Sequence, residues 1–226
     1  MTLATLWPPI ALTLSLAGIT TLILLVVGTP IGWWLARGRW VGKDAISAIV
    51  ALPLVLPPTV LGFYLLLVLG PFGPGGWLAG MWGGRTLAFS FPGLVIGSVF
   101  YSLPFMVHPL RGAFESIAEE ELEVASTLGA SNRQRFFRVA VPLARSGFIN
   151  GAVFTFAHTI GEFGVVLMLG GNIPGQTKVL SIAIYDYVER LEWGHAHILA
   201  LGMVLFSFLA ITTMMIVDRR LRLVRI

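Results

Sequence analysis

The sequence predicts an all-α integral membrane protein with about five transmembrane helices, a helical cytoplasmic loop and a short helix at the outer face. Three observations support this fold class. Hydrophobic residues make up 56% of the 226 positions and charged residues only 12%, about half the share found in ordinary soluble domains. Five stretches are apolar over the roughly 20 residues that a helix needs to cross a bilayer core. Basic residues cluster after the first, third and fifth stretches. The whole chain, residues 1–226, is expected to form one membrane domain.

The five predicted spans follow one another along the whole chain. Each is taken as helical because the bilayer core holds no water to satisfy the hydrogen-bonding groups of an irregular backbone. The fourth span differs from the others because it carries one charged residue, Glu162, well inside its apolar run. The predicted spans are residues 9–35, 45–69, 87–110, 146–169 and 194–217.

The distribution of basic residues predicts the orientation of the spans. All but three of the fifteen Lys and Arg residues lie between spans one and two, between spans three and four, or after span five. Because basic residues are retained on the cytoplasmic side, the N-terminus is expected in the periplasm and the C-terminus in the cytoplasm. The same distribution argues against nucleic acid as a partner, since each cluster lies next to a membrane exit. These basic residues are Arg37, Arg39, Lys43, Arg111, Arg133, Arg135, Arg138, Arg145, Arg219, Arg220, Arg222 and Arg225.

Two segments on the outer side are not expected to cross the membrane. Residues 177–193 contain an apolar run that is too short for a span and is interrupted by Asp186. A sixth span there would place the basic C-terminus outside, and so a short helix at the outer face is expected. Residues 70–84 are rich in Gly, Pro and Trp, which predicts an irregular turn at the headgroup level.

The long cytoplasmic connection, residues 115–145, predicts two short helices. Its glutamate-rich first part is expected to be mainly a solvated helix face, and apolar residues at helical spacing follow it. Gly129 predicts the end of the first helix because glycine tolerates a positive φ. Ser131, followed three residues later by Gln134, matches a capping box and predicts the start of the second helix, which leads into Pro142.

Part of this connection resembles the EAA motif of binding-protein-dependent ABC permeases. The residues that carry the resemblance are Glu123, Ala125, Gly129 at six positions after the glutamate, and Pro142 at the end of the motif. Valines replace one alanine, the isoleucine and the leucine of the family form, and these are apolar exchanges of similar size. The motif also lies where the family has it, between a third and a fourth predicted span.

A second resemblance extends over most of the chain. Residues 52–66, 127–143 and 161–177 are similar to the molybdate permease subunits of ABC importers. Sulfate permeases carry related motifs, but they are usually longer and have an additional N-terminal span. That span is missing from this sequence, which favours molybdate over sulfate.

The resemblance implies a non-enzymatic permease subunit of the bacterial inner membrane that couples ATPase motion to the passage of molybdate. Two copies of the chain would assemble with two cytoplasmic ATP-binding subunits, and a periplasmic molybdate-binding protein would deliver the oxyanion. Membrane lipid would surround the complex, and no cofactor is implied. The residues implied to dock on the ATPase are Glu123, Ala125, Gly129, Ala130, Ser131 and Arg133.

Prolines in the second span provide candidates for the pathway or gate. Pro53, Pro57 and Pro58 are expected to break the helix within the membrane. Such a break is tolerated only where protein or a water-filled cavity satisfies the freed backbone groups. Both a pathway lining and a structural kink are open interpretations for Pro57, Pro58 and Thr59.

Glu162 is the other candidate, because an ionisable residue within a span is a functional hypothesis by default. A carboxylate would repel an anion, however, and so Glu162 is expected to support helix packing or gating. His158, four residues earlier, is a candidate partner on the same helix face. His195 and His197 lack a neighbouring cluster with ligand spacing, and so no metal site is expected.

Other functions are open on the sequence alone. The permease resemblance also allows sulfate, tungstate or another oxyanion as the substrate. A secondary transporter or channel is a different class, but no paired repeat with matched broken helices is visible. A membrane-embedded enzyme would need catalytic clusters that the spans lack. Because no Walker loop or nucleotide fingerprint occurs, the energy source is expected on another chain.

Overall fold

The computed structural model describes residues 3–38, 40–81 and 83–223, with only the backbone given for residues 3–6 and 217–223. Within these residues the chain is helical and has no strands, which confirms the predicted all-α class. Arg39 and Arg225, and the side chains of Arg219, Arg220 and Arg222, lie outside this description. The elements are α1 (Leu3–Arg37), α2 (Lys43–Val55), α3 (Pro58–Leu69), α4 (Pro74–Gly80), α5 (Phe91–Glu115), α6 (Glu119–Thr127), α7 (Asn132–Arg135), the π-helical turn η1 (Phe136–Ala140), α8 (Val141–Leu143), α9 (Arg145–Gly161), α10 (Gly164–Gly170), α11 (Leu180–Glu189) and α12 (Trp193–Leu223).

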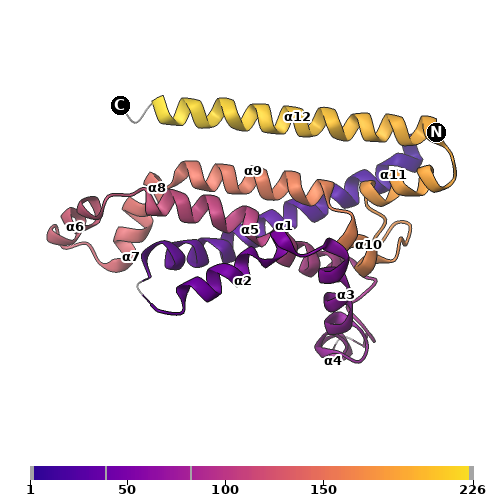
Figure 1. Cartoon of the computed structure of the whole chain (residues 1–226), viewed down its shortest axis with the longest axis horizontal. Helices are drawn as coiled ribbons and strands as arrows, with labels where there is room; N and C mark the ends of the chain where they lie inside the picture. Colours follow the sequence, from indigo (N-terminus) through magenta and orange to yellow (C-terminus); the bar gives the residue numbers. More distant parts are fainter. Residues whose placement is uncertain (1–2, 39, 82, 224–226) are drawn as a thin grey trace.

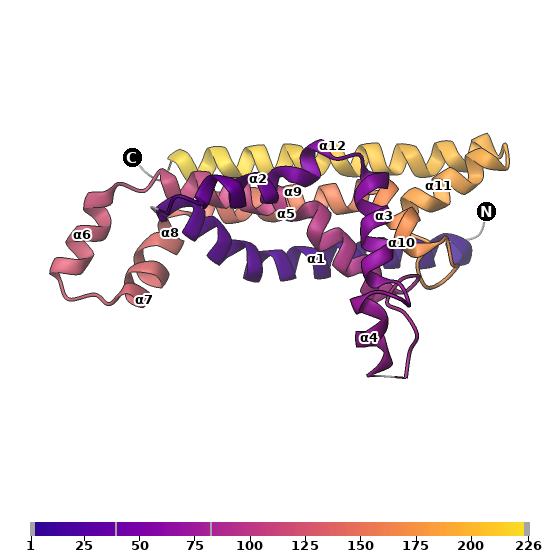
Figure 2. The same ribbon diagram turned by 60° about the horizontal axis from the view of Figure 1, so that its bottom comes forward.

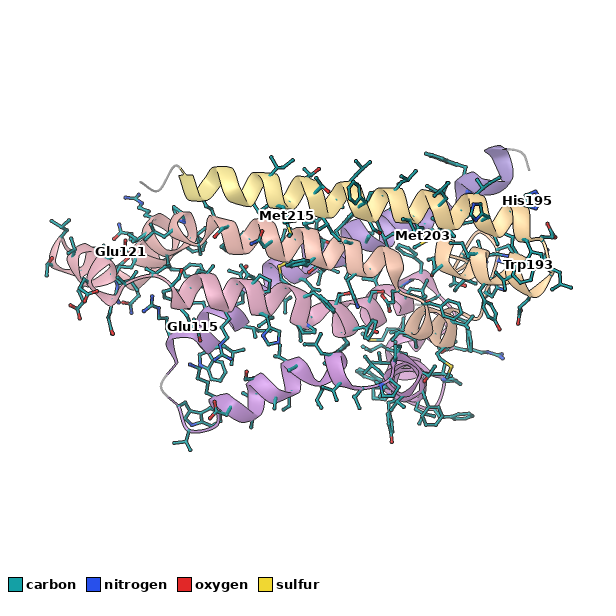
Figure 3. The ribbon with its side chains drawn as sticks, turned by 45° about the horizontal axis from the view of Figure 1, so that its top comes forward. Glu115, Glu121, Trp193, His195, Met203 and Met215 are labelled. Carbon is teal, nitrogen blue, oxygen red and sulfur yellow. The ribbon has the colours of Figure 1, made fainter. Side chains whose placement is uncertain are left out.

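The long helices lie side by side along one axis, with α6 and α7 at one end, α11 near the other, and α3 and α4 off one flank (Figure 1). One end of the bundle carries α6 and α7 and is called the loop end; the other carries α11 and is called the α11 end. In Figure 3, Glu115 and Glu121 mark the loop end, whereas Trp193 and His195 mark the α11 end. The two ends of α12 therefore lie near opposite ends of the bundle, as expected for a helix that spans a membrane.

Three single helices are long and apolar enough to cross a membrane, and they correspond to predicted spans one, three and five. They are residues 7–37 of α1, the whole of α5, and residues 193–216 of α12. Two further spans are obtained only if each of two bent helix pairs is counted as one span. The first pair is α2 with α3, bent by 112°, and the second is residues 132–143 with α9, bent by 69°.

The second predicted span is broken at Pro57. Leu56 is extended, with ψ of 135°, as is usual for a residue before proline. Pro58 occupies the first helical position of α3, where its missing N–H group has no cost. Pro53, in contrast, lies inside α2 without ending it. Beyond the break, α3 and α4 project away from the long helices (Figures 1 and 2).

The fourth predicted span is also interrupted, and the expectation of one continuous helix over 146–169 is wrong. α9 ends at Gly161, Glu162 is extended with φ of −66° and ψ of 129°, and α10 begins at Gly164. A glycine lies on each side of the interruption, and glycine is the weakest helix former after proline. Tertiary contacts of Glu162, described below, stabilise the extended conformation.

The helices differ widely in burial. Half of the apolar window of α5 is buried, but only 6% of that of α12. One buried hydrophobic cluster draws on α1, α3, α5, α10 and α11, and a second, nearer the loop end, draws on α1, α5 and η1. α12 runs along the outside of the bundle (Figures 1 and 2). The apolar surface of α12 suits contact with lipid, because lipid tails are as apolar as the side chains that it exposes.

Two short helices, α11 and α4, test the predictions for the outer segments. α11 has ten residues, a length of about 15 Å, and so the expected short helix is confirmed. The segment 70–84, for which an irregular turn was expected, contains the seven-residue helix α4. Pro74 starts this helix at its first position, a placement that proline favours. The expectation of an irregular turn is therefore wrong for residues 74–80.

Candidate functional site

The turn between α6 and α7 is the first candidate site, and Gly129 lies at its centre. Gly129 has φ of 82°, a left-handed conformation that suits glycine. The N–H groups of Gly129 and Ala130 donate to the carbonyl oxygens of Ser126 and Ala125, at 2.9 and 3.0 Å. These bonds satisfy the last acceptors of α6, as a glycine C-cap does. The predicted helix end is confirmed.

The start of α7 carries the predicted capping box. Ser131 N–H donates to Oε1 of Gln134 at 2.9 Å, and Gln134 N–H donates to Oγ of Ser131 at 3.3 Å. The two bonds satisfy backbone donors that have no partner within the helix. The turn is therefore stabilised on both sides by residues within ten positions of one another.

The second helix of the loop is less regular than predicted. After four α-helical residues it widens into the π-helical turn η1, closed by a bond from Val141 N–H to the carbonyl oxygen of Phe136. Pro142 follows directly, and its ring clashes with a carbonyl four residues earlier in a regular helix. A π-helical turn relieves this clash. The segment then bends by 69° into α9.

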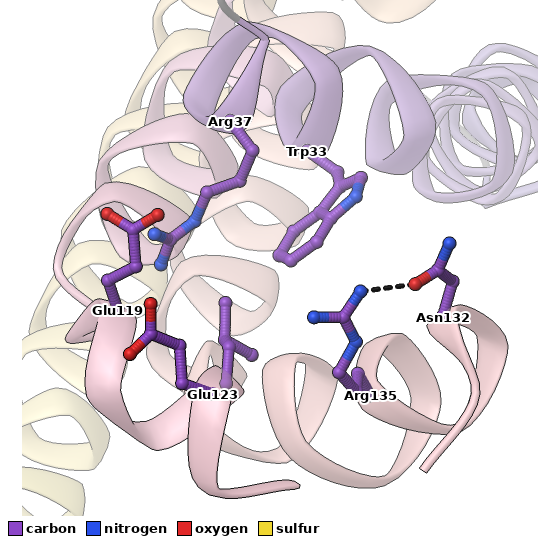
Figure 4. A pocket seen from close by; sticks show the side chains of 7 residues that line it. Trp33, Arg37, Glu119, Glu123, Asn132 and Arg135 are labelled. Carbon is purple, nitrogen blue, oxygen red and sulfur yellow. Dashed lines mark hydrogen bonds between the residues drawn. The ribbon is translucent and has the colours of Figure 1, made fainter. Parts of the chain in front are cut away.

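The predicted docking residues lie on the surface of the loop. Glu123, Gly129, Ser131 and Arg133 are exposed, whereas Ala125 and Ala130 are partly buried. Behind this surface a cavity of about 440 Å³ separates α6 and α7 from the end of α1 (Figure 4). Its lining includes carboxylates and guanidinium groups, contributed by Arg37, Glu119, Glu123 and Arg135. The loop thus presents an exposed turn and a hollow inner side.

The two helix breaks form the second candidate site, because they lie against one another. A Cβ atom added to Gly164 would lie 2.7 Å from Cβ of Pro58. One added to Gly62 would lie 2.8 Å from Cβ of Met168. The start of α3 therefore packs closely on α10 through two glycines. Thr59, in the first turn of α3, is exposed beside this contact.

Glu162 lies at the break between α9 and α10 and is 3% exposed. Its Oε2 accepts a hydrogen bond from Ser98 of α5 at 2.7 Å, and its carbonyl oxygen accepts one from Ser181 of α11 at 2.6 Å. Its Oε1 is buried without a hydrogen-bond partner among the residues described. Glu162 thus links three elements, which fits a role in packing or gating.

His158 does not pair with Glu162 as the sequence suggested. Its Nδ1 lies 3.0 Å from Oγ of Ser102, and its ring stacks on Phe105 with centroids 3.9 Å apart. Ser102 Oγ also lies 3.0 Å from Oγ1 of Thr159. The imidazole therefore belongs to a second polar contact between α5 and α9, one turn from the Ser98 contact. Within the described part of the chain, no three potential metal ligands cluster.

Asp186 organises a polar network at the α11 end. It accepts hydrogen bonds from Lys178 and from Asn172, the latter at 2.8 Å, and Arg190 lies 3.4 Å away. Burial disfavours the charged carboxylate, but the hydrogen bonds and the two cations hold the pKa of Asp186 below its ordinary value. The charge that interrupts the apolar run of 177–193 therefore ties α11 to the loop before it.

Sequence reasoning missed the partners of these residues. Ser98 and Ser102 have a recognisable signal, since two serines at i and i+4 on an apolar helix share one face. Trp33 and Arg37, which contact the base of the 115–145 loop, have no comparable signal. Their contacts join residues about eighty positions apart, and local patterns do not reach that far.

The apolar helical bundle, with an exposed glycine turn between its third and fourth spans, agrees with the architecture expected from the resemblance to ABC permeases. Residues 28–223 match the family described as the binding-protein-dependent transport system inner membrane component. The chain belongs to this family. Membership establishes an inner-membrane component of a transport system.

Individual relatives differ in their similarity. The molybdenum transport system permease protein ModB of Azotobacter vinelandii is 63% identical over 202 residues, 89% of either chain. The sulfate transport system permease protein CysW of Synechocystis is 34% identical in an alignment of 197 residues that covers 84% of this chain and 70% of that protein. A bacterial alginate ABC transporter, solved with an alginate pentasaccharide-bound periplasmic protein, has a TM-score of 0.76 at 18% identity, covering 96% of this chain and 79% of that one. This last likeness concerns the fold.

Proposed function

We propose that the chain is the permease subunit of an ATP-driven importer for molybdate. The observation that carries the proposal is the 63% identity, over 89% of both chains, to a molybdenum transport permease. Similarity to a sulfate permease is only 34% and leaves more of that relative unmatched. The experiment is ATP-dependent uptake by the reconstituted transporter, with radiolabelled molybdate and competing sulfate. If unlabelled sulfate inhibited this uptake as strongly as unlabelled molybdate does, the assignment would be contradicted.

In this proposal the chain carries out no chemistry itself. A second copy completes the pathway, two cytoplasmic ATP-binding subunits hydrolyse ATP, and a periplasmic molybdate-binding protein supplies the anion. Family membership supports these partners, since the family is named for dependence on a binding protein. The structural likeness to a transporter solved with its periplasmic protein gives further support.

The 115–145 loop is the proposed contact with the ATPase. Its exposed turn at Gly129 and the capped start of α7 give a rigid protrusion that a groove on another protein can enclose. A rigid protrusion suits the task, because rigid-body motion is transmitted poorly by a flexible segment. ATP binding would move the loop, and the bundle would then open toward the periplasm.

The second proposed site concerns the pathway. Pro58, which Pro57 and Thr59 flank in the chain, lies against Gly164 at the paired breaks, and interrupted helices in transporters commonly flank a substrate route. Glu162 is assigned to positioning the breaks, since its carboxylate is buried against Ser98. Molybdate and sulfate are both tetrahedral dianions, so discrimination is assigned to the binding protein, where buried donors match one anion size.

The proposed orientation places the loop end in the cytoplasm and the α11 end in the periplasm. The native chain has no cysteine, and so single cysteines report accessibility directly. Gly80, in α4 of the predicted outer segment 70–84, suits the test because it is exposed and a Cβ there meets nothing within 4 Å. Gly80→Cys should react with an impermeant maleimide in intact spheroplasts, whereas Arg133→Cys should react only after the membrane is opened. The reverse pattern would contradict the orientation.

A further inference from the structure

The end of α1 contacts the base of the 115–145 loop, although the two are far apart in the sequence. Arg37, the last residue of α1, donates from Nη2 to the carbonyl oxygens of Phe114 and Ile117, at 3.0 and 2.6 Å. Phe114 belongs to the last turn of α5, and Ile117 lies in the link to α6. Carbonyl groups at a helix end lack intrahelical partners and favour a cation. Arg37 therefore ties α1 to the segment through which α5 continues into the loop.

A cluster of aromatic rings reinforces this contact. Trp33, one turn before Arg37, packs edge-on against Phe114 and Phe136, with centroids 5.1 and 5.2 Å apart. Phe114 packs edge-on against Phe148 at 5.9 Å. Edge-to-face packing is a preferred geometry for such rings. These four residues, called the aromatic joint, come from α1, α5, η1 and α9.

The two loop helices, α6 and α7, lie mainly at the surface. No residue of α6 or α7 is buried, whereas Phe114 in the joint is completely buried. The cavity of about 440 Å³ lies between the two loop helices and the end of α1 (Figure 4). Leu122 of α6 packs against the buried cluster that contains Phe114 and Ile117. The apolar contact between the loop and the bundle is therefore concentrated at Leu122 and at the aromatic joint.

We propose that Arg37 and Trp33 are positioning residues that make α1 part of the mechanical connection between the loop and the membrane bundle. The loop is continuous in sequence only with α5 and, through η1 and α8, with α9. Through the joint, a displacement of the loop also reaches α1, because packed and hydrogen-bonded groups move as a body. This inference rests on the proposed ATP-driven function.

The test uses the full transporter, reconstituted with its ATP-binding subunits and binding protein. The double variant Trp33→Leu, Arg37→Met removes the ring and the guanidinium group but retains apolar volume. It should co-purify with the ATP-binding subunits and hydrolyse ATP at the basal rate within twofold. Stimulation of hydrolysis by the binding protein, and uptake, should each fall at least tenfold. The control double variant Trp34→Leu, Lys43→Met changes a tryptophan that is 38% exposed and the lysine at which α2 begins. Its stimulated ATP hydrolysis and its uptake should remain within twofold of native.

Conservative variants and a second readout separate transmission from folding. Trp33→Phe and Arg37→Lys retain a ring and a cation, and each should recover at least a third of native uptake. Uptake by the first double variant within twofold of native would overturn the inference. Loss of the protein from the membrane, or of the ATP-binding subunits from the complex, would also overturn it, since the pair would then serve folding or docking. Failure of the native complex to import with ATP would instead contradict the proposed function.

Discussion

The turn between α6 and α7 and the break between α9 and α10 both interrupt helices, but different contacts stabilise them. At the turn, Gly129 and the Ser131–Gln134 capping box act within ten residues and are open to solvent. At the break, Glu162 is buried and bonded to Ser98 and Ser181, which are 64 and 19 positions away. The turn is thus local and exposed, whereas the break is long-range and buried.

This difference predicts how each region responds to substitution. A substitution in a local, exposed turn removes at most the stabilisation that the caps of that turn provide, and it leaves the packing of the bundle unchanged. A buried break shares its contacts with several helices, and so a substitution there disturbs their packing as well. Substitutions at the break should therefore change stability, and those at the turn should change transport with little effect on stability.

The largest effect is expected at Gly164, where the two breaks meet. Gly164→Leu would force a side chain into Pro58, since even a Cβ atom would lie 2.7 Å from the proline Cβ. Overpacking of this kind typically costs about 1–3 kcal/mol, and the upper end is expected here. The measurement is the midpoint of thermal denaturation in detergent. Gly161→Ala is the matched control, because a Cβ there meets nothing within 4 Å; equal midpoints for both variants would refute the close contact.

The next largest effect is expected at Ser98. Ser98→Ala removes the donor to Oε2 of Glu162 and leaves a buried carboxylate without it, which should lower the free energy of unfolding by about 2 kcal/mol. Ser116→Ala is the control, since that serine is exposed and its hydroxyl donates to the carbonyl oxygen of Ala113 at its own helix end. Denaturant-induced unfolding in detergent measures both. A Ser98 variant as stable as the Ser116 variant would remove Glu162 from the stabilising network.

The sequence predicts those features of the molecule whose contacts join residues close together in the chain. The glycine turn and the capping box were predicted because each depends on residues a few positions apart. The break at Pro57 was predicted for the same reason. The break at Glu162 was not, because its extended backbone depends on Ser98 and Ser181 of other helices. Docking and pathway roles stay predictions, as a single chain carries no partner.

At the turn, Gly129 should give the largest effect. Gly129→Val places a β-branched residue at φ of 82°, where a left-handed conformation costs about 1–2 kcal/mol. Uptake should fall about tenfold while the denaturation midpoint stays native. Gly129→Asn, which tolerates this conformation, should retain most of the uptake. Since a Cβ at Gly129 has open space around it, a fall with Asn as large as with Val would exclude backbone strain as the cause.

Ser131 should give a smaller effect at the same turn. Ser131→Ala removes one bond of the capping box, and loss of such a cap costs about 1 kcal/mol. Uptake should fall a few fold, and Ser131→Asp, which restores a capping acceptor, should recover it. Hydrogen exchange of the α7 backbone amides reports the cap directly. Unchanged exchange in the alanine variant would show that the box does not stabilise α7.

The smallest effect is expected for a substitution that removes the charge of Glu162 but retains the shape of its side chain. In Glu162→Gln the side-chain carbonyl can still accept the Ser98 hydrogen bond, so the break should persist. If the carboxylate repelled or bound the passing anion, removing its charge would change the relative uptake of molybdate and sulfate. If it only positions α5, α10 and α11, as its burial indicates, the ratio of the two uptake rates should stay within twofold of native, even where both rates fall together. Competition uptake at equal anion concentrations measures this ratio. A larger change would move Glu162 into the pathway and leave the Ser98 contact as its support.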